Sequence, residues 1–154
     1  MVNISDYIAA VAQHLQEDDI LRPMVDGQII PGFRRAAADQ FLAGAHQACV
    51  GVRSLSKNSA SLGGAAWHGG GIHDHLIEIR IITMLSDSRP DSSYAYQIAD
   101  EVERLLRSGF DQEINDVNYH LSVVRGINFT QLDDDQVSDR IEVQATVRIN
   151  YIAR

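Results

Sequence analysis

The stretch from Arg140 to Tyr151 near the end of the chain constrains the fold more than any other part of the sequence. Its apolar residues occupy every second position: Ile141, Val143, Ala145, Val147, Ile149 and Tyr151. Successive side chains of a β-strand point to opposite faces, so this spacing produces one apolar face and one polar face. A helix would spread the same residues around its circumference. The stretch therefore predicts a long strand in a sheet that buries one face and presents the other to water or to a partner.

Length and charge narrow the class of protein. The 154 residues suit one domain, with 45% apolar and 22% charged residues. A net charge of -8 argues against broad contact with nucleic-acid backbone, which requires clustered Lys and Arg. A single cysteine, Cys49, leaves no internal disulfide and no zinc site built from cysteines. Met1 to Ile8 lacks the basic start of a signal peptide, and no run approaches the roughly 18 apolar residues of a membrane span. We therefore expect a protein made in the cytoplasm, without membrane contact.

The remaining pattern predicts an α+β domain that spans residues 1–154. The expected elements are a helix capped at Asn3 that ends near Glu17, a strand over Gln47–Leu55, a long flexible loop over residues 56–72, a strand over His73–Ser86, a helix that starts near Pro90 and stops at Gly109, a strand over Val117–Phe129, and the final strand. Residues 28–45 are interpreted as a connector. This order predicts an antiparallel or mixed sheet of about four strands, with two main helices packed on one face.

Two motifs, one within the long loop and one after it, are candidates for a catalytic or metal site. His68-Gly69-Gly70-Gly71 matches in letters a segment of lipase oxyanion holes, but the Gly-x-Ser-x-Gly elbow that such enzymes need is absent. His73-x-His75 places two imidazoles on one face of a strand, which suits zinc, copper or nickel, but no third ligand stands at a fixed spacing. The alternative is a pair of histidines at the solvated start of a strand. We expect no metal and no other cofactor.

Charged residues give a mild indication of assembly. Asp133, Asp134 and Asp135 are typical of a solvated turn, since they lack the spacing of a calcium loop. Lys57 is the only lysine, so the remaining positive charge is arginine, which suits bidentate contacts in protein interfaces.

The layout resembles the tail terminator (tail completion) proteins of long-tailed bacteriophages, in three places. The first is the opening Ile-Ser-Asp-Tyr-Ile-Ala-Ala-Val-Ala-Gln-His-Leu from Ile4. The second is His75-Leu-Ile-Glu-Ile-Arg-Ile-Ile-Thr-Met-Leu-Ser, followed by Tyr96-Gln-Ile-Ala-Asp-Glu-Val-Glu-Arg-Leu-Leu. The third is the stretch from Asp133 through Arg-Ile-Glu-Val-Gln-Ala-Thr-Val-Arg-Ile-Asn-Tyr. The similarity covers nearly the whole chain in the order of its elements and in their pattern of apolar and polar residues, while the long loop departs from the family.

The resemblance implies a structural role without catalysis. Family members form a homo-hexameric ring on the head-proximal end of the tail tube, where the ring stops tube polymerisation and offers a docking surface to the neck. The implied partners are other copies of the chain, the tail tube protein, a neck or head-completion protein, and the sheath if the tail contracts. DNA would pass through an acidic lumen without specific binding, and the protein would reside at the tail-neck junction of the virion.

We expect partner contacts in the long loop, at the acidic turn and on the last strand: Trp67, His68, Asp133, Asp134, Asp135 and Arg148. The acidic turn is expected near the lumen or the tube-facing surface. Three alternatives stay open at this point: a neck or head-completion connector, a small enzyme that binds metal through His73 and His75, and a small-ligand-binding α+β module.

Overall fold

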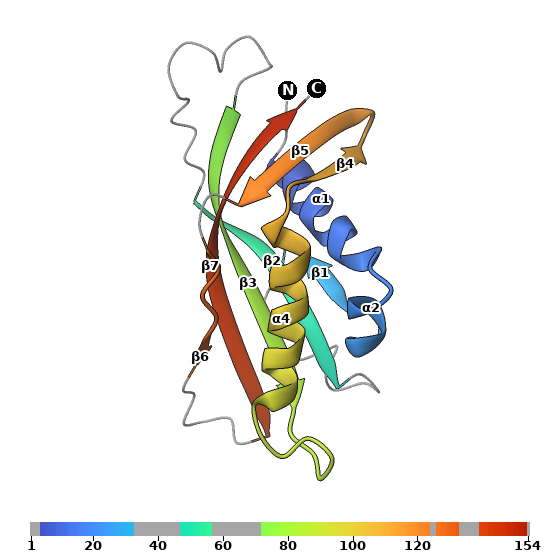
Figure 1. Cartoon of the computed structure of the whole chain (residues 1–154), viewed down its shortest axis with the longest axis vertical. Helices are drawn as coiled ribbons and strands as arrows, with labels where there is room; N and C mark the ends of the chain where they lie inside the picture. Colours follow the sequence, from blue (N-terminus) through green and yellow to red (C-terminus); the bar gives the residue numbers. More distant parts are fainter. Residues whose placement is uncertain (1–3, 33–46, 57–71, 124–125, 133–138, 154) are drawn as a thin grey trace.

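The computed structural model of the chain describes residues 4–32, 47–56, 72–123, 126–132 and 139–153 (Figure 1). The elements in this part of the chain are α1 (Ile4–Gln16), α2 (Leu21–Met24), β1 (Ile29–Pro31), β2 (Ala48–Ser56), β3 (Ile72–Met84), α4 (Ser93–Arg107), β4 (Phe110–Ile114), β5 (Val117–Val123), β6 (Thr130–Leu132) and β7 (Arg140–Ala153).

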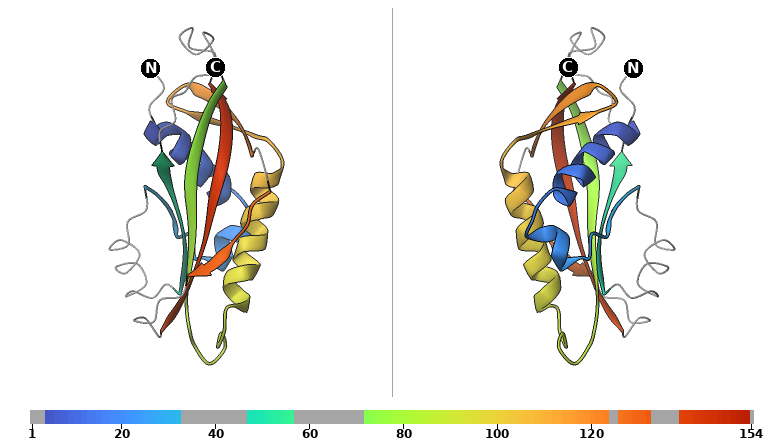
Figure 2. Two further views of the ribbon diagram at one scale, coloured as in Figure 1. Left: turned by 90° about the vertical axis from the view of Figure 1, so that its left-hand side faces the viewer. Right: turned by 90° about the vertical axis from the view of Figure 1, so that its right-hand side faces the viewer.

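All described strands belong to one mixed sheet, curled into a half-barrel. Its order is β1-β2-β3-β7-β5-β4, and β6 also pairs with β7. The spine of the sheet is the antiparallel pair β3 and β7, in register from Ile72↔Ile152 to Met84↔Arg140. The β1–β2 pair is parallel, and the other neighbours are antiparallel. Figure 2 shows the long β3–β7 pair running nearly the height of the molecule, with α4 along one side of it.

The predicted sheet of about four strands with two main helices is wrong. The described part of the chain holds seven strands and three helices. Two short strands, β1 and β6, have only three residues each, too few for a pattern of period two to stand out. The predicted single strand Val117–Phe129 is also wrong, because β5 ends at Val123 and β6 begins at Thr130.

The hairpin of β4 and β5 was missed for a local reason. Asn115 and Asp116 connect the two strands, and both have positive φ, of 51° and 63°. Such a two-residue turn matches the right-handed twist of the flanking strands, and Asn and Asp tolerate this backbone region best after glycine. The turn signal was therefore present in the sequence, but the five residues of β4 include three polar ones.

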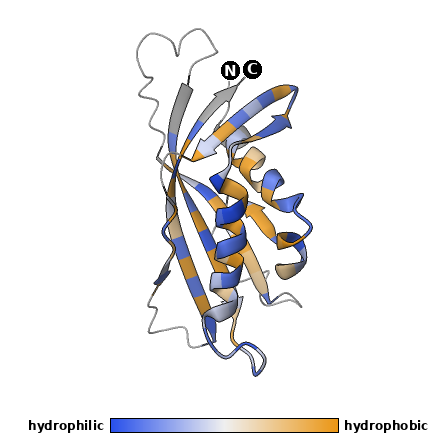
Figure 3. Cartoon of the chain, in the orientation of Figure 1, coloured by the Kyte–Doolittle hydropathy of each residue, from blue (hydrophilic) through white to orange (hydrophobic). Residues whose placement is uncertain are grey.

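The strands and helices with strong periodicity are confirmed, apart from the strand expected to run on to Phe129. The final strand is β7, and Val143 and Val147 on its inner side are buried while Thr146 and Arg148 on its outer side are exposed. The alternation is visible as stripes along β7 in Figure 3. α1, β2 and β3 each begin and end within two residues of the predicted bounds, and α4 begins three residues after Pro90.

The core lies between the inner face of the sheet and the two longer helices. The fully buried side chains of this layer are Tyr7, Val11, Leu15, Ile77, Ile79, Ile81, Ile98, Val102, Leu106, Val143 and Ile149. Each large apolar side chain contributes about 1.5–3 kcal/mol when it leaves water. α1 and α4 are also joined directly, since the imidazole Nε2 of His14 lies 2.9 Å from the carbonyl oxygen of Leu105. No helix in the described ranges is long and apolar enough to cross a bilayer.

Candidate functional site

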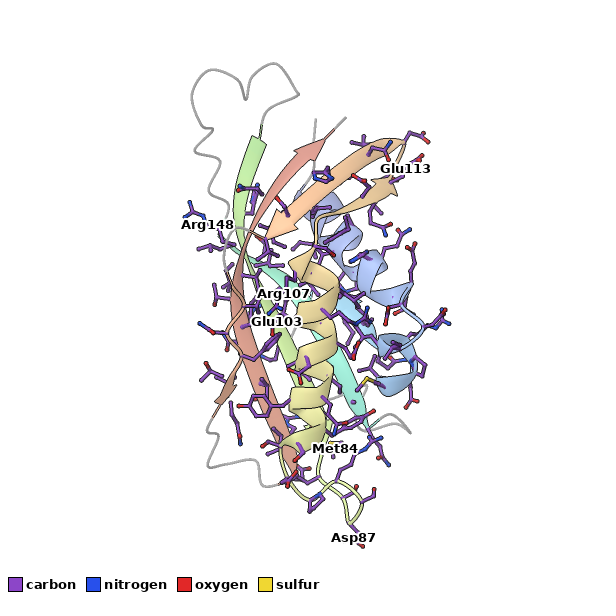
Figure 4. All side chains as sticks on the ribbon, in the orientation of Figure 1. Met84, Asp87, Glu103, Arg107, Glu113 and Arg148 are labelled. Carbon is purple, nitrogen blue, oxygen red and sulfur yellow. The ribbon has the colours of Figure 1, made fainter. Side chains whose placement is uncertain are left out.

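The candidate site is the outer face, which we define as the side of β2, β3 and β7 opposite the helices. Strand alternation places Arg53, Glu78, Arg80, Gln144 and Arg148 there, because Val52, Ile77, Ile79, Val143 and Val147 fill the inner side. Figure 4 shows Arg148 projecting from β7, well away from Glu103 and Arg107 on α4.

A buried carboxylate fixes the centre of the outer face. Glu78 is 1% exposed, although it lies on the side of the sheet away from the main core. Its Oε2 accepts a hydrogen bond from Nε of Arg53, and its Oε1 accepts one from Arg80 Nη2 at 2.8 Å. Arg80 also donates to the side-chain oxygen of Gln144 at 3.3 Å. We call Arg53, Glu78 and Arg80 the arginine cluster.

The arginine cluster has an excess of positive charge. Burying a carboxylate without partners costs several kcal/mol. Glu78 has two guanidinium partners, although one would already balance its charge. The side chain of Arg53 stays 43% exposed and that of Arg80 15% exposed. The cluster therefore holds Arg53 in a fixed place at the surface, where its remaining N–H groups can meet an acidic partner.

Two leucines form an exposed apolar patch beside the cluster. Leu55 is 44% exposed and Leu76 is 37% exposed. The register shifts between Ser54 and Ser56, so Leu55 is the extra residue of a β-bulge and lies next to Leu76. On the other side Leu76 pairs with Arg148. We call Leu55, Leu76 and Arg148 the leucine patch.

A groove opens beyond the cluster, between β6 and β7. Its volume is about 380 Å³, and the residues that line it are Asn128, Thr130, Leu132, Gln144 and Thr146. β6 pairs with β7 over three residues beside the groove. The lining of the groove combines hydroxyl and amide groups, which can donate or accept hydrogen bonds, with the apolar side chain of Leu132.

The opposite end of the outer face is buried, and its one thiol is unreactive. Cys49 and Ile82 are fully buried there and pack against Ile30 and Met84. Burial raises the pKa of the Cys49 thiol to about 12, which keeps it protonated at neutral pH. A protonated, inaccessible thiol is neither a nucleophile nor a metal ligand.

Of the predicted contact residues, Arg148 lies on the outer face and is exposed. Trp67, His68, Asp133, Asp134 and Asp135 lie outside the described residues. So do residues 57–71 of the loop predicted over residues 56–72, whose end residues Ser56 and Ile72 belong to β2 and β3.

The metal hypothesis finds no support in the described part of the chain. No group of three His, Cys, Asp or Glu side chains described by the structure could hold a metal ion. His75 is 4% exposed on the inner face, with its ring centroid 4.7 Å from that of Tyr7. The interpretation of His75 as a solvated residue at the start of a strand is also wrong, because the strand begins at Ile72 and carries it into the core.

The sequence reasoning missed the arginine cluster and the leucine patch. The signal was present, since Leu76, Glu78 and Arg80 alternate along β3 with three buried isoleucines. What the pattern lacked was the register, which places Arg53 of β2 opposite Glu78 and Arg148 of β7 opposite Leu76.

Comparisons with known proteins bear on the fold. No protein family and no curated protein sequence matches the chain. A solved chain described as "Virion of native gene transfer agent (GTA) particle" is similar over 97% of this chain and 99% of its own length, with a TM-score of 0.61 and 17% identity. A second solved chain, which carries no functional name, is similar over 97% of this chain and 96% of its own, with a TM-score of 0.55 and 11% identity. At these identities the likeness establishes a shared fold from one end of the chain to the other.

Proposed function

We propose that the chain is a structural protein of a virion or virion-like particle. The observation that carries this proposal is the likeness to a chain from a gene transfer agent virion, which spans 97% of this chain and 99% of that one. A match across both whole chains pairs complete folds, whereas a shared motif would pair only a fragment of each. The residues of the outer face support the same role, because arginine is enriched at protein interfaces and the arginines here border two exposed leucines.

Within the particle, we propose the role of tail terminator. A ring of copies would sit on the head-proximal end of the tail tube, end its polymerisation and offer a new surface to the neck. The long β3–β7 pair suits this task, because a rigid sheet can cover the last ring of the tube without rearranging. Capping of this kind is steric, so it needs no catalytic residue. The protein would then reside at the tail-neck junction, with the tube protein and a neck protein as its partners.

The proposal is tested by measuring mass in solution, first for the protein alone and then with purified tail tube protein. Light scattering gives the size, and negative-stain microscopy locates the protein. We expect a closed ring, either free or formed on one end of each tube. A protein that stays monomeric and ignores the tube would refute the terminator role.

The neck connector is the second outcome of the same experiment. A connector would bind purified portal or head-completion protein and leave the tube ends bare. Adding the portal protein in a parallel mixture therefore separates the two roles, because a terminator requires the tube end for its first contact.

A further inference from the structure

The turn between α1 and α2 carries an exposed apolar residue within an acidic segment. Ile20 is 55% exposed, and the side chain of Asp19 beside it is 92% exposed. Glu17 and Asp18 precede them, so three carboxylates adjoin one isoleucine. We call Glu17–Ile20 the acidic corner.

The acidic corner is held in a fixed shape. Asp18 Oδ2 accepts hydrogen bonds from the backbone N–H groups of Ile20 at 3.0 Å and Leu21 at 2.7 Å. The same carboxylate accepts two hydrogen bonds of 3.0 Å from Arg104 of α4. Asp18 therefore clamps the turn onto α4, while Ile20 remains exposed and Asp19 forms a solvent-exposed ion pair of 3.3 Å with Arg22. A preorganised surface loses little freedom when it binds.

The leucine patch has the complementary character. It presents two apolar side chains next to Arg148, and Arg53 of the arginine cluster borders it. The described side chains on the outer face of β2, β3 and β7 include four arginines and two glutamates: Arg53, Arg80, Arg140, Arg148, Glu78 and Glu142. The described side chains of this face therefore carry two more positive than negative charges, four arginines against two glutamates, in a chain whose net charge is -8.

The two surfaces lie on opposite sides of the molecule. The turn between α1 and α2 is at the right in Figure 1, and Arg148 projects to the left in Figure 4, which has the same orientation. Because the patches face apart, a single partner cannot contact both of them in a two-fold pair. They can join copies head to tail, and such contacts close into a ring when the rotation between copies closes.

We propose that the acidic corner of one copy docks on the leucine patch of the next copy. Ile20 would bury against Leu55 and Leu76, and Asp19 would meet Arg148. The occupant is a second copy because the chain itself carries the matching surface, apolar at its centre and of opposite charge. This inference rests on the proposed assembly role and names the surfaces through which the ring closes.

The test uses two charge reversals, Arg148→Glu and Asp19→Arg, in the full chain. Both residues are exposed, so the variants should keep the circular dichroism spectrum and thermal unfolding of the wild type. Asp87→Arg and Arg107→Glu are the matched controls, because they make the same charge changes on the exposed β3–α4 turn and the far end of α4. Self-association is measured by analytical ultracentrifugation, alone and with tail tube protein.

Each single reversal should weaken self-association by at least about tenfold, since it juxtaposes like charges at the contact. The controls should associate like the wild type. An equal mixture of Arg148→Glu and Asp19→Arg should recover association, because alternating copies restore an opposite pair at every contact. Such a mixture closes only rings with an even number of copies.

The outcomes separate the inference from the proposed function. If wild-type rings form and both reversals leave them intact, or if the mixture fails to recover association, the proposed contact is refuted while the terminator role stands. If the wild type neither self-associates nor binds the tube, both are refuted.

Discussion

The buried carboxylate of Glu78 gives the sharpest test of the outer face. We predict that Glu78→Gln destabilises the protein far more than Glu103→Gln, although both changes remove one carboxylate from a pair with arginine. The two sites differ in burial. Glu78 is 1% exposed between Arg53 and Arg80, whereas the side chains of Glu103 and Arg107 are 26% and 76% exposed.

The magnitude follows from what each change leaves behind. Breaking a buried ion pair costs roughly 3–5 kcal/mol when the remaining charge stays buried. Arg53 is 43% exposed and can turn to water, but Arg80 is 15% exposed and cannot. We therefore expect Glu78→Gln to lower the free energy of unfolding by about 2–4 kcal/mol. Glu103→Gln breaks an exposed i,i+4 pair, worth about 0.5 kcal/mol or less.

The assay is reversible unfolding in urea, followed by circular dichroism and checked by thermal melting. At roughly 2–4 °C per kcal/mol for a domain of this size, Glu78→Gln should lower Tm by roughly 5–15 °C. A loss below about 1 kcal/mol, no larger than that of Glu103→Gln, would refute the reasoning that the arginine cluster is a buried, interdependent unit.

Three further predictions concern single residues. Because burial raises the pKa of Cys49 to about 12, the native thiol at pH 8 should react with a thiol reagent at least about 100-fold more slowly than the thiol of unfolded protein. As pH rises, the thiol of the unfolded protein ionises first, so the free energy of unfolding should fall above the ordinary thiol pKa of 9.0. Burial acts to raise the pKa of Asp18, but hydrogen bonds from Leu21 and Arg104 outweigh it and lower the pKa. Asp18→Asn should therefore lower Tm at neutral pH. The difference in Tm from the wild type should shrink as pH falls below the ordinary carboxyl pKa of 3.8. Asp116 has φ of 63° in the β4–β5 turn, so Asp116→Gly should raise the free energy of unfolding by roughly 0.5–1 kcal/mol, and a decrease in urea midpoint would contradict this account of the turn.

The parts of the fold that the sequence predicted are those with long, regular periodicity. β7 alternates from Ile141 to Tyr151 and β3 from Ile77 to Ile81, and α4 buries Ala95, Ile98, Val102 and Leu106 at helical spacing. Each long run repeats the same evidence, so its assignment survives a few exceptions. β1 and β6 offer three residues each, and each is defined by its pairing with the strand that follows it, which a pattern of three residues cannot report.

The candidate site shows the same division. Alternation places Glu78 and Arg80 together on the face of β3 opposite three buried isoleucines, and this much is readable from the sequence. The partners of Glu78 depend on register, because Arg53 is 25 residues distant in the chain. The bulge that brings Leu55 beside Leu76 also depends on how β2 pairs with β3. Alternation in the sequence can thus assign a charged side chain to one face of a strand, whereas its partners become known only with the register.

The length of tail tubes polymerised with and without this protein tests the central proposal most directly. Purified tube protein is allowed to assemble, and tube lengths are measured by negative-stain microscopy over a series of protein concentrations. The account predicts shorter tubes as the concentration rises, with added density at one end of each tube, and Arg148→Glu should need at least about tenfold more protein for the same shortening. Tubes of unchanged length with bare ends would contradict it.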